Sequence, residues 1–415
     1  MTQPGTLILI MAIAVLAPLL AYRVNRWVPV PLVIFEIVLG ILIGPDVLAL
    51  AQHDEFTDGL ADFGLAMLIF LAGYEIDFAA VRGDTLRRST GAWMISIAAG
   101  LGIAFALTGA EVNKSFVIGT ALTSTALGTV LPILRDSGDL RGRFGTVVLA
   151  FGAVGEFGPI IAMALLLSGR GAGESTVLLI VFAAVTAAAV FWALRPRPPW
   201  FARIIANTLH SSGQFAVRYV MLLLAAMLGL SHAFGIDVLL GAFAAGVISR
   251  LILHGAAPES SGEILGKIEA MGFGFFVPVF FVVTGINFDL KALLDGGRAL
   301  VLLPVFLLLF LVVRGIPLYL LAPSDLSRRD RTALTLYGST CLPLVVAITT
   351  IGLDDKSISS SEAAALVGAA MVSVLVFPLL ALKFRSGRGE SAADRAGHGE
   401  GSDRPSRAGE ASESW

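Results

Sequence analysis

Hydrophobic residues occur along the chain in long continuous runs separated by short polar segments, and this pattern predicts membrane-spanning helices. The runs approach the roughly 20 residues that cross a bilayer core as helix, and they lack the alternation of a transmembrane β-strand. We predict an all-α polytopic fold, embedded in a lipid bilayer, with thirteen spans. These lie near residues 6–22, 31–48, 59–77, 92–109, 115–134, 144–168, 175–193, 214–230, 236–253, 271–286, 299–321, 332–352 and 361–382.

The loops between these spans alternate in their content of basic residues. One set of alternate loops, which includes Arg87 and Arg88, carries nineteen Lys and Arg residues, whereas the other set carries five. Because Lys and Arg accumulate in cytoplasmic loops, we expect a multi-pass protein of the cell membrane with its N-terminus outside and its C-terminus in the cytoplasm. The composition changes to Ser, Gly and charged residues after Phe384. We therefore expect a transmembrane domain over residues 1–384 and a disordered, hydrophilic cytoplasmic tail over 385–415.

Composition excludes several functional classes. Of the 415 residues 56% are hydrophobic and only 14% are charged, which is too apolar for a soluble domain of this size. The net charge of −2 argues against a nucleic-acid partner. The single cysteine, Cys341, excludes an internal disulfide and a cysteine-rich metal site. Because no Gly-rich phosphate loop, nucleophile elbow or zinc motif occurs, we expect neither an enzyme nor a bound cofactor.

The two halves of the chain resemble each other at a nearly constant offset. Three matches share it: TALT at 120–123 and 332–335, a proline at 132 and 343, and Gly-x-x-x-Asp at 73–77 and 285–289. The offset relates span three to span ten and span five to span twelve. This is a shift of seven spans, and an odd shift inverts the topology. Inverted repeats are typical of secondary transporters, whose binding site lies near the midplane where the repeats meet.

The repeat-related spans five and twelve both contain residues that interrupt helices. Proline removes a donor and clashes with the previous turn, glycine loosens a helix, and hydroxyls can replace lost backbone partners. We assign the interruptions to Gly128, Pro132, Gly338 and Pro343. The hydroxyl groups expected to serve as ion ligands, or as braces of the broken helices, are Ser124, Thr125, Ser339 and Thr340. The alternative is that these small residues only let helices pack closely.

Two ionisable residues lie deep within predicted spans, and such residues are functional candidates by default. Glu156 lies in AFGAVGEFGPII, near the middle of span six. Arg314 lies in LLLFLVVRGIPLY, about eight residues and roughly 12 Å from the cytoplasmic end of span eleven. Glu156 is the predicted group that binds a proton or a monovalent cation, and Arg314 is the predicted fixed countercharge. The alternative is a structural ion pair, although buried pairs contribute little net stability.

The resemblance to a known family rests on five segments: PLVIFEIVLGILIGP (31–45), FLAGYEID (70–77), ALTSTALGTVLPIL (121–134), GIDVLLGAFAAGVISR (235–250) and FFVPVFFVVTGINFD (275–289). Together they resemble the monovalent cation:proton antiporter-2 family, which contains Kef-type and Nap-type sodium or potassium/proton exchangers. The segments occur in family order, and the resemblance extends over about 20–380. It implies the sodium/proton antiporter fold, with thirteen helices in a dimerisation domain and a core domain with two crossed broken helices. It also implies homodimers and elevator-like alternating access.

The family usually carries an Asn-Asp, Asp-Asp or Gln-Asp pair in the sixth span, and the last Asp binds the cation or the proton. The corresponding stretch here is GAVGEFG, so the resemblance implies Glu156 as the counterpart, with Gly155 in place of the preceding polar residue. The family's lysine late in the eleventh span corresponds to Arg314, and Ser124 and Thr125 match positions near the family's ion site. No cytoplasmic nucleotide-binding domain follows the spans, so we expect no Kef-type ligand gating.

These observations predict a proton-coupled antiporter that exchanges Na⁺ or K⁺ for H⁺ by alternating access. Only one titrating carboxylate is visible at the site, because Gly155 precedes Glu156 and an arginine such as Arg314 stays protonated near neutrality. Exchange is therefore expected to be electroneutral. Two alternatives remain open: export of an organic or ionophore-bound solute by the same scaffold, and a non-transporting membrane sensor. The sequence does not distinguish Na⁺ from K⁺, since both take oxygen ligands.

Overall fold

The computed structural model describes residues 3–24, 26, 30–51, 55–75, 83–166, 172–195, 198–234, 238–295 and 297–397, and all regular structure within these ranges is helical. The elements in chain order are α1 (Gln3–Val24), α2 (Leu32–Ile43), α3 (Glu55–Glu75), α4 (Asp84–Leu107), α5 (Val112–Ala121), α6 (Leu127–Asp136), η1 (Asp139–Arg141), α7 (Arg143–Leu166), α8 (Ala172–Ala193), α9 (Pro199–Thr208), α10 (Phe215–Phe234), α11 (Val238–Ala256), α12 (Ser261–Met271), η2 (Gly272–Phe276), α13 (Val277–Ile286), α14 (Leu290–Asp295), α15 (Arg298–Leu309), η3 (Phe310–Gly315), α16 (Ile316–Leu321), α17 (Arg328–Gly338), α18 (Pro343–Asp354) and α19 (Ser360–Gly397).

Each of the thirteen predicted spans overlaps a helical segment within the described ranges. Ten helices in the described ranges are long and apolar enough to cross a membrane, and Leu32–Ile43 and Ile180–Ala193 are shorter apolar helices. Span five is divided into α5 and α6, each of 10 residues. The helices α9, α12 and α14 were not predicted. The composition changes after residue 384, but the helix does not end there: α19 continues to Gly397. This segment contains Ala, Glu and Arg, which favour helix. Residues 398–415, and Asp77 of the predicted repeat, lie outside the described ranges.

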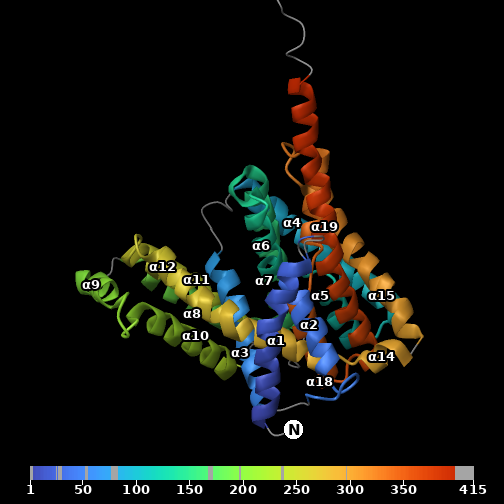
Figure 1. Ribbon diagram of the computed structural model, residues 1–415, viewed down its shortest axis with the longest axis horizontal. Coiled ribbons are helices and arrows are strands. Elements are labelled where there is room, and N and C mark those ends of the chain that lie inside the picture. The colour runs from blue at the N-terminus through green and yellow to red at the C-terminus, as the bar shows by residue number, and fades with distance from the viewer. Residues whose placement is uncertain are drawn as a thin grey trace, which may run out of the picture.

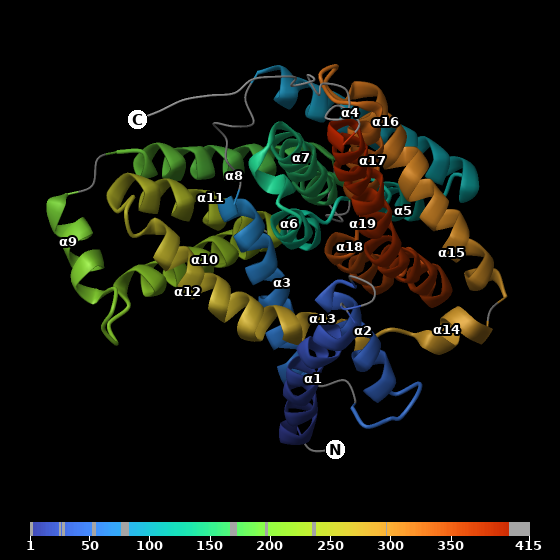
Figure 2. The ribbon, with the colours of Figure 1, turned by 45° about the horizontal axis from the view of Figure 1, so that its top comes forward.

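The helices form two packed groups, which Figures 1 and 2 show side by side. The scaffold bundle consists of α1, α2, α3, α10, α11 and the continuous α12–η2–α13 segment. The core bundle consists of α4, α5, α6, α7, α15 to α18 and α19, and α8 contacts both bundles through α7 and α11. In Figure 1 the N-terminus lies at the bottom, and α19 rises to the opposite end of the molecule.

In the scaffold bundle, α2 and α13 cross with their backbones in contact. The carbonyl oxygen of Val282 occupies the place that a Cβ atom on Gly40 would take, and the carbonyl of Ile37 does the same at Gly285. Small residues are what allow helix backbones to approach this closely in a membrane, where van der Waals packing is a main source of helix association. Both glycines are therefore required by the crossing itself.

The crossing of α3 and α11 repeats this arrangement. The carbonyl of Phe70 fills the Cβ position of Gly246, and the carbonyl of Phe243 fills that of Gly73. Gly73 of this crossing and Gly285 of the α2–α13 crossing are related by the offset of the sequence repeat, which also relates the first residues of α1 and α10. Gly40 and Gly246 are the second pair of equivalent positions, because the carbonyls that they contact, of Val282 and Phe70, are related by the same offset. The predicted inverted repeat, including its match of Gly73 with Gly285, is thus confirmed by equivalent backbone contacts.

Arg385, near the end of the membrane-spanning part of α19, ties together several elements of the core bundle. Its guanidinium forms ion pairs with Asp139 of η1, at 2.6 Å, and with Asp330 of α17. It also stacks 3.7 Å above the ring centre of Phe144 in α7. Only 11% of the Arg385 side chain is exposed, so this cluster is much less screened by water than a surface ion pair. We call these four residues the Arg385 clamp.

Candidate functional site

The extended segments that divide span five and span twelve cross each other inside the core bundle. The backbone N–H of Ala126 donates to the carbonyl of Thr340 at 2.7 Å. The hydroxyl of Thr125 donates to the carbonyl of Gly338 at 2.6 Å. Helix ends leave backbone donors and acceptors without partners, and these two bonds satisfy some of them across the repeats. The two crossed broken helices predicted from the sequence are therefore present.

The structure locates the two interruptions differently from the residues assigned to them. Gly338 ends α17 and Pro343 begins α18, as expected. In the other repeat the interruption comes earlier than predicted: it lies at 122–126, and Gly128 and Pro132 both belong to α6. The polar run Thr-Ser-Thr causes this shift, because short hydroxyl side chains bond to nearby carbonyls and so compete with the helix.

Three of the four candidate hydroxyls brace the interruptions. Ser124 donates to the carbonyl of Ala121 at 2.9 Å, and Thr340 donates to that of Leu336 at 3.0 Å. Thr125 is committed to Gly338, as described above. Ser339 differs: its hydroxyl is buried and has no hydrogen-bond partner among the described residues. Ser339 is therefore the one of these four candidates whose hydroxyl neither donates to nor accepts from a described residue.

Glu156 lies on α7, and 2% of its surface is exposed. One helical turn after Gly155, Pro159 lacks the N–H that would bond to the Gly155 carbonyl in a regular helix. The backbone N–H of Thr125 donates to this carbonyl instead, at 3.0 Å. The bond fixes the chain immediately before Glu156 to the interruption between α5 and α6. Sequence and packing together thus position the carboxylate beside the crossing.

Arg314 lies in the π-helical segment η3 and is completely buried. Its Nε donates to the Thr125 hydroxyl at 3.0 Å, and its Nη2 donates to the Phe151 carbonyl at 2.8 Å. Its Nη1 has no hydrogen-bond partner among the described residues. The guanidinium and the Thr125 side chain occupy the space that a Cβ atom at Gly155 would take. Glycine at position 155 is therefore what makes room for the arginine.

Glu156 and Arg314 both lie beside Gly155 but do not form an ion pair, as far as the described residues go: Arg314 bonds to Thr125 and Phe151 instead. The structural ion pair considered as an alternative is therefore not what the structure contains. No hydrogen bond joins the Glu156 carboxylate to a described residue either. Its electrostatic neighbour is another carboxylate, Glu75 at the end of α3.

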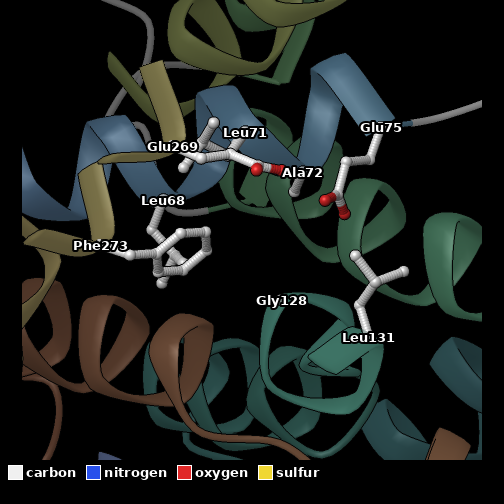
Figure 3. Close-up of a pocket in the computed structure, with 8 residues that line it drawn as sticks. All are labelled: Leu68, Leu71, Ala72, Glu75, Gly128, Leu131, Glu269 and Phe273. Carbon is white, nitrogen blue, oxygen red and sulfur yellow. The ribbon is translucent and has the colours of Figure 1, made fainter. Parts of the chain in front are cut away.

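Glu75 lines a cavity of about 160 Å³ between α3, α6 and the α12–η2 segment. Figure 3 shows it with Glu269 of α12, together with the apolar side chains of Leu131 and Phe273. The cavity lies between the scaffold and core bundles. Sequence reasoning did not single out Glu75 or Glu269. The signal was present in FLAGYEID, where Glu75 directly follows an apolar run, but its proximity to Glu156 depends on how α3 packs against the core.

Within the described ranges, no group of three or more His, Cys, Asp or Glu side chains could hold a metal ion. The crossing itself offers the Glu156 carboxylate together with hydroxyl and backbone carbonyl oxygens. The buried oxygen-rich crossing beside Glu156 is the candidate functional site.

Comparison with known proteins gives matches over most of the chain. Residues 11–382 match the family model described as sodium/hydrogen exchanger, transmembrane. The putative Na⁺/H⁺ antiporter YjbQ of Bacillus subtilis is 26% identical over 399 residues, which cover 91% of this chain and 62% of that protein. The probable Na⁺/H⁺ antiporter 3 of Methanocaldococcus jannaschii is 24% identical over 299 residues, which cover 69% of this chain and 72% of that protein.

A solved structure shares the fold. The sodium proton antiporter MjNhaP1 from Methanocaldococcus jannaschii superposes with a TM-score of 0.65 at 16% sequence identity, and the match covers 92% of this chain and all of that one. This chain spans less than two thirds of the length of YjbQ, at 62%. The family model nevertheless covers nearly all of the helical part, including both interruptions. The chain therefore belongs to the sodium/hydrogen exchanger family.

Proposed function

We propose that the chain is a proton-coupled antiporter that exchanges a monovalent cation for H⁺ across the cell membrane. The observation that carries this proposal is the position of Glu156, buried on α7 beside the crossed interruptions and hydrogen-bonded to no described residue. An ionisable group at membrane depth is costly and usually functional. A carboxylate without a fixed partner can hold a proton and a cation in turn. The names of the relatives, which are Na⁺/H⁺ antiporters, support the same activity.

The oxygen atoms around the crossing would complete the coordination of the cation. Glu156 supplies the negative charge, and Ser339 supplies a hydroxyl that has no other described partner. Ser124, Thr125 and Thr340 each donate their hydroxyl proton to a carbonyl, so their oxygens keep lone pairs for a cation. One lone pair of the Thr125 oxygen already accepts the Nε–H of Arg314. This oxygen set suits Na⁺ and K⁺ alike. One relative, GerN of Bacillus cereus, is named a Na⁺/H⁺-K⁺ antiporter and is 26% identical over 266 residues.

Arg314 would act as a fixed positive charge rather than as a proton carrier. Its guanidinium is anchored to Thr125 and Phe151 and packs against Gly155, next to the titrating residue. It offsets the charge of the deprotonated Glu156 without bonding to it. With glycine at position 155, the residue before Glu156 adds no second exchangeable charge. We therefore propose that one H⁺ is exchanged for one monovalent cation.

Alternating access would arise from movement of the core bundle, which carries Glu156, against the scaffold bundle. The bundles meet along few contacts, chiefly α3 with α6, α2 with α19, and the linking helix α8. The loop charges support an N-terminus outside and a C-terminus in the cytoplasm. A homodimer assembled through the scaffold bundle completes the proposal. Neither organic solute export nor a sensor role is favoured by the relatives that the chain matches.

The proposal is tested by exchange measurements on the purified protein in proteoliposomes with an internal pH-sensitive dye. Glu156→Gln keeps the size of the side chain but removes the titrating charge, so Na⁺- or K⁺-driven proton movement should disappear. Glu259→Gln makes the same chemical change at an exposed loop position and should leave exchange intact. Correct folding of both variants is checked by size-exclusion chromatography. Wild-type exchange by Glu156→Gln would refute the assignment of the coupling carboxylate.

A further inference from the structure

Another buried carboxylate, that of Glu36, lies on α2 in the scaffold bundle. It is 3% exposed and lies one helical turn before Gly40. Glu36 lines a cavity of about 590 Å³ that is bounded by α2, α6, the η2–α13 segment and α19. Among the described residues, none is hydrogen-bonded or ion-paired to its side chain. An ionisable group that is buried in a cavity without a partner is costly, so a role in packing alone does not account for it.

The repeat shows that the α2–α13 crossing does not require this carboxylate. Gly40 and Gly246 have equivalent places in the two scaffold crossings. One helical turn before Gly246, the counterpart of Glu36 is Ala242 of α11, which is fully buried. The same crossing is therefore built with a methyl group in one repeat and with a carboxylate in the other. The acidic side chain is a feature of the cavity and not of the fold.

The walls of the cavity are mostly apolar. Leu68, Val277, Phe281 and Leu379 line it, and Thr129 and Ser137 contribute hydroxyl groups. Its volume falls within the range of pockets that hold small organic molecules, which are typically apolar with a few polar groups that orient the ligand. A bare Na⁺ would gain nothing from apolar walls, and an anion would be repelled by Glu36. The lining is complementary to a molecule with one positive charge and an apolar body.

We propose that this cavity binds an amphipathic organic monocation, with its ammonium or guanidinium group against Glu36 and its apolar body among the side chains of α13 and α19. A charge-assisted hydrogen bond from the ligand would supply the partner that Glu36 lacks. Glu156 does not line this cavity, whose lining shares Leu68, Gly128 and Phe273 with the Glu75 cavity.

Such a ligand would contact both bundles at once. The cavity is lined by α2 and α13 from the scaffold bundle and by α6 and α19 from the core bundle. A molecule wedged between them holds one arrangement of the bundles, because it binds only where both walls are in place. If the chain exchanges ions as proposed above, the bound cation should slow exchange. This consequence rests on the proposed function, whereas the binding itself does not.

Binding is tested by isothermal titration calorimetry on the full chain in lipid nanodiscs, with empty nanodiscs as the blank. The probe is 4-phenylbutylammonium, compared with the neutral 4-phenylbutanol and the anionic 4-phenylbutyrate. The wild type should bind the ammonium at least about tenfold more tightly than the alcohol, and should not bind the carboxylate measurably. Equal affinity for the ammonium and the alcohol would overturn the proposal, without any variant being needed.

Glu36→Gln should reduce the affinity for the ammonium to that for the alcohol, whereas the exposed control Glu259→Gln should bind like the wild type. Phe281→Ala should weaken binding of the ammonium and the alcohol alike. Unchanged ammonium binding by Glu36→Gln would place the ligand elsewhere and refute the site. Glu156→Gln should bind 4-phenylbutylammonium normally. A failure of the proposed exchange activity is therefore distinguishable from a failure of ligand binding at Glu36. In proteoliposomes the ammonium should slow exchange by the wild type, and the alcohol should not.

Discussion

The backbone N–H of Thr125 donates to the carbonyl of Gly155 at 3.0 Å, and this bond takes the place of the one that Pro159 cannot make. It joins the interruption of one repeat to the helix that carries Glu156. The hydroxyl of the same threonine bonds to Gly338 in the other repeat. Through Thr125, both broken helices are therefore linked by hydrogen bonds to the residue before Glu156.

Substitution of Gly155 should disturb the site more than its small size suggests. In Gly155→Ala the new methyl group overlaps the Arg314 guanidinium and the Thr125 side chain, both of which are buried. Overpacking of this kind costs about 1–3 kcal/mol, so the melting temperature and the exchange rate should both fall. Gly229→Ala in α10 is the matched control, because nothing lies within 4 Å of its added Cβ. Equal melting temperatures for the two variants would contradict this packing.

Thr125→Val should separate the hydroxyl from the shape of the side chain. The variant loses the bond to the Gly338 carbonyl and leaves the Arg314 Nε without its acceptor. Each buried polar group left unpaired costs about 1–3 kcal/mol, so both stability and apparent cation affinity should decrease. Thr125→Ser keeps the oxygen and should stay close to the wild type. If the cation concentration for half-maximal exchange does not change in Thr125→Val, Thr125 has no role in cation binding.

Ser339→Ala should affect function without a loss of stability. The hydroxyl of Ser339 is buried without a described partner, so its removal eliminates an unsatisfied group. We expect an equal or higher melting temperature together with weaker apparent cation affinity. Ser124→Ala is the contrasting variant, since it removes a bond to the Ala121 carbonyl and should lower the melting temperature. Unaltered cation affinity in Ser339→Ala would exclude this hydroxyl as a ligand.

Arg385→Leu should destabilise the core bundle strongly. It leaves the carboxylates of Asp139 and Asp330 without this guanidinium, and these side chains are only 20% and 6% exposed. Breaking such a buried pair typically costs about 3–5 kcal/mol. Arg87→Leu provides the surface control, since the ion pair of Arg87 with Asp84 is exposed and should contribute at most about 1 kcal/mol. Thermal unfolding in detergent compares the two, and similar losses would contradict a structural role for the Arg385 clamp.

Exchange should be electroneutral, because Gly155 and the packed guanidinium leave no second titrating group at position 155. A membrane potential acts with about 2.3 kcal/mol per charge per 100 mV on any step that moves net charge. The test is the equilibrium cation gradient in proteoliposomes at a fixed pH gradient, with the potential clamped by an independent ionophore. The gradient should not depend on voltage, and a shift with voltage would rule out one-for-one exchange.

Much of the architecture could be predicted because it follows from patterns of residue type along the chain. Runs of apolar residues indicated the thirteen spans, and the match of Gly73 with Gly285 indicated the inverted repeat. Glu156 could be chosen as a candidate because a carboxylate within an apolar run is rare. The position of the first interruption was wrong, since Gly128 and Pro132 were weighted above the hydroxyls of Ser124 and Thr125.

Other features depend on contacts between distant segments. The bonding of Arg314 joins η3 to Thr125 and to the carbonyl of Phe151 in α7, which no local pattern specifies. The approach of Glu75 to Glu156 requires knowledge of the fit between the bundles. The Arg385 clamp likewise brings the last helix of the chain onto η1 and α7, which precede it by most of the sequence. Residue type and depth indicated that buried charges were unusual, but not which partners they have.

The two glycine crossings of the scaffold bundle have a mechanical consequence. At Gly40, Gly73, Gly246 and Gly285, main chain rests directly on main chain. No side chain lies between the helices at these points. A change of rotamer therefore cannot let one helix slide along the other, and the crossings are rigid joints. The scaffold should therefore act as a stiff frame throughout the proposed transport cycle. Its amides at these joints should be among the slowest in the chain to exchange with deuterium, whichever side of the membrane the site faces.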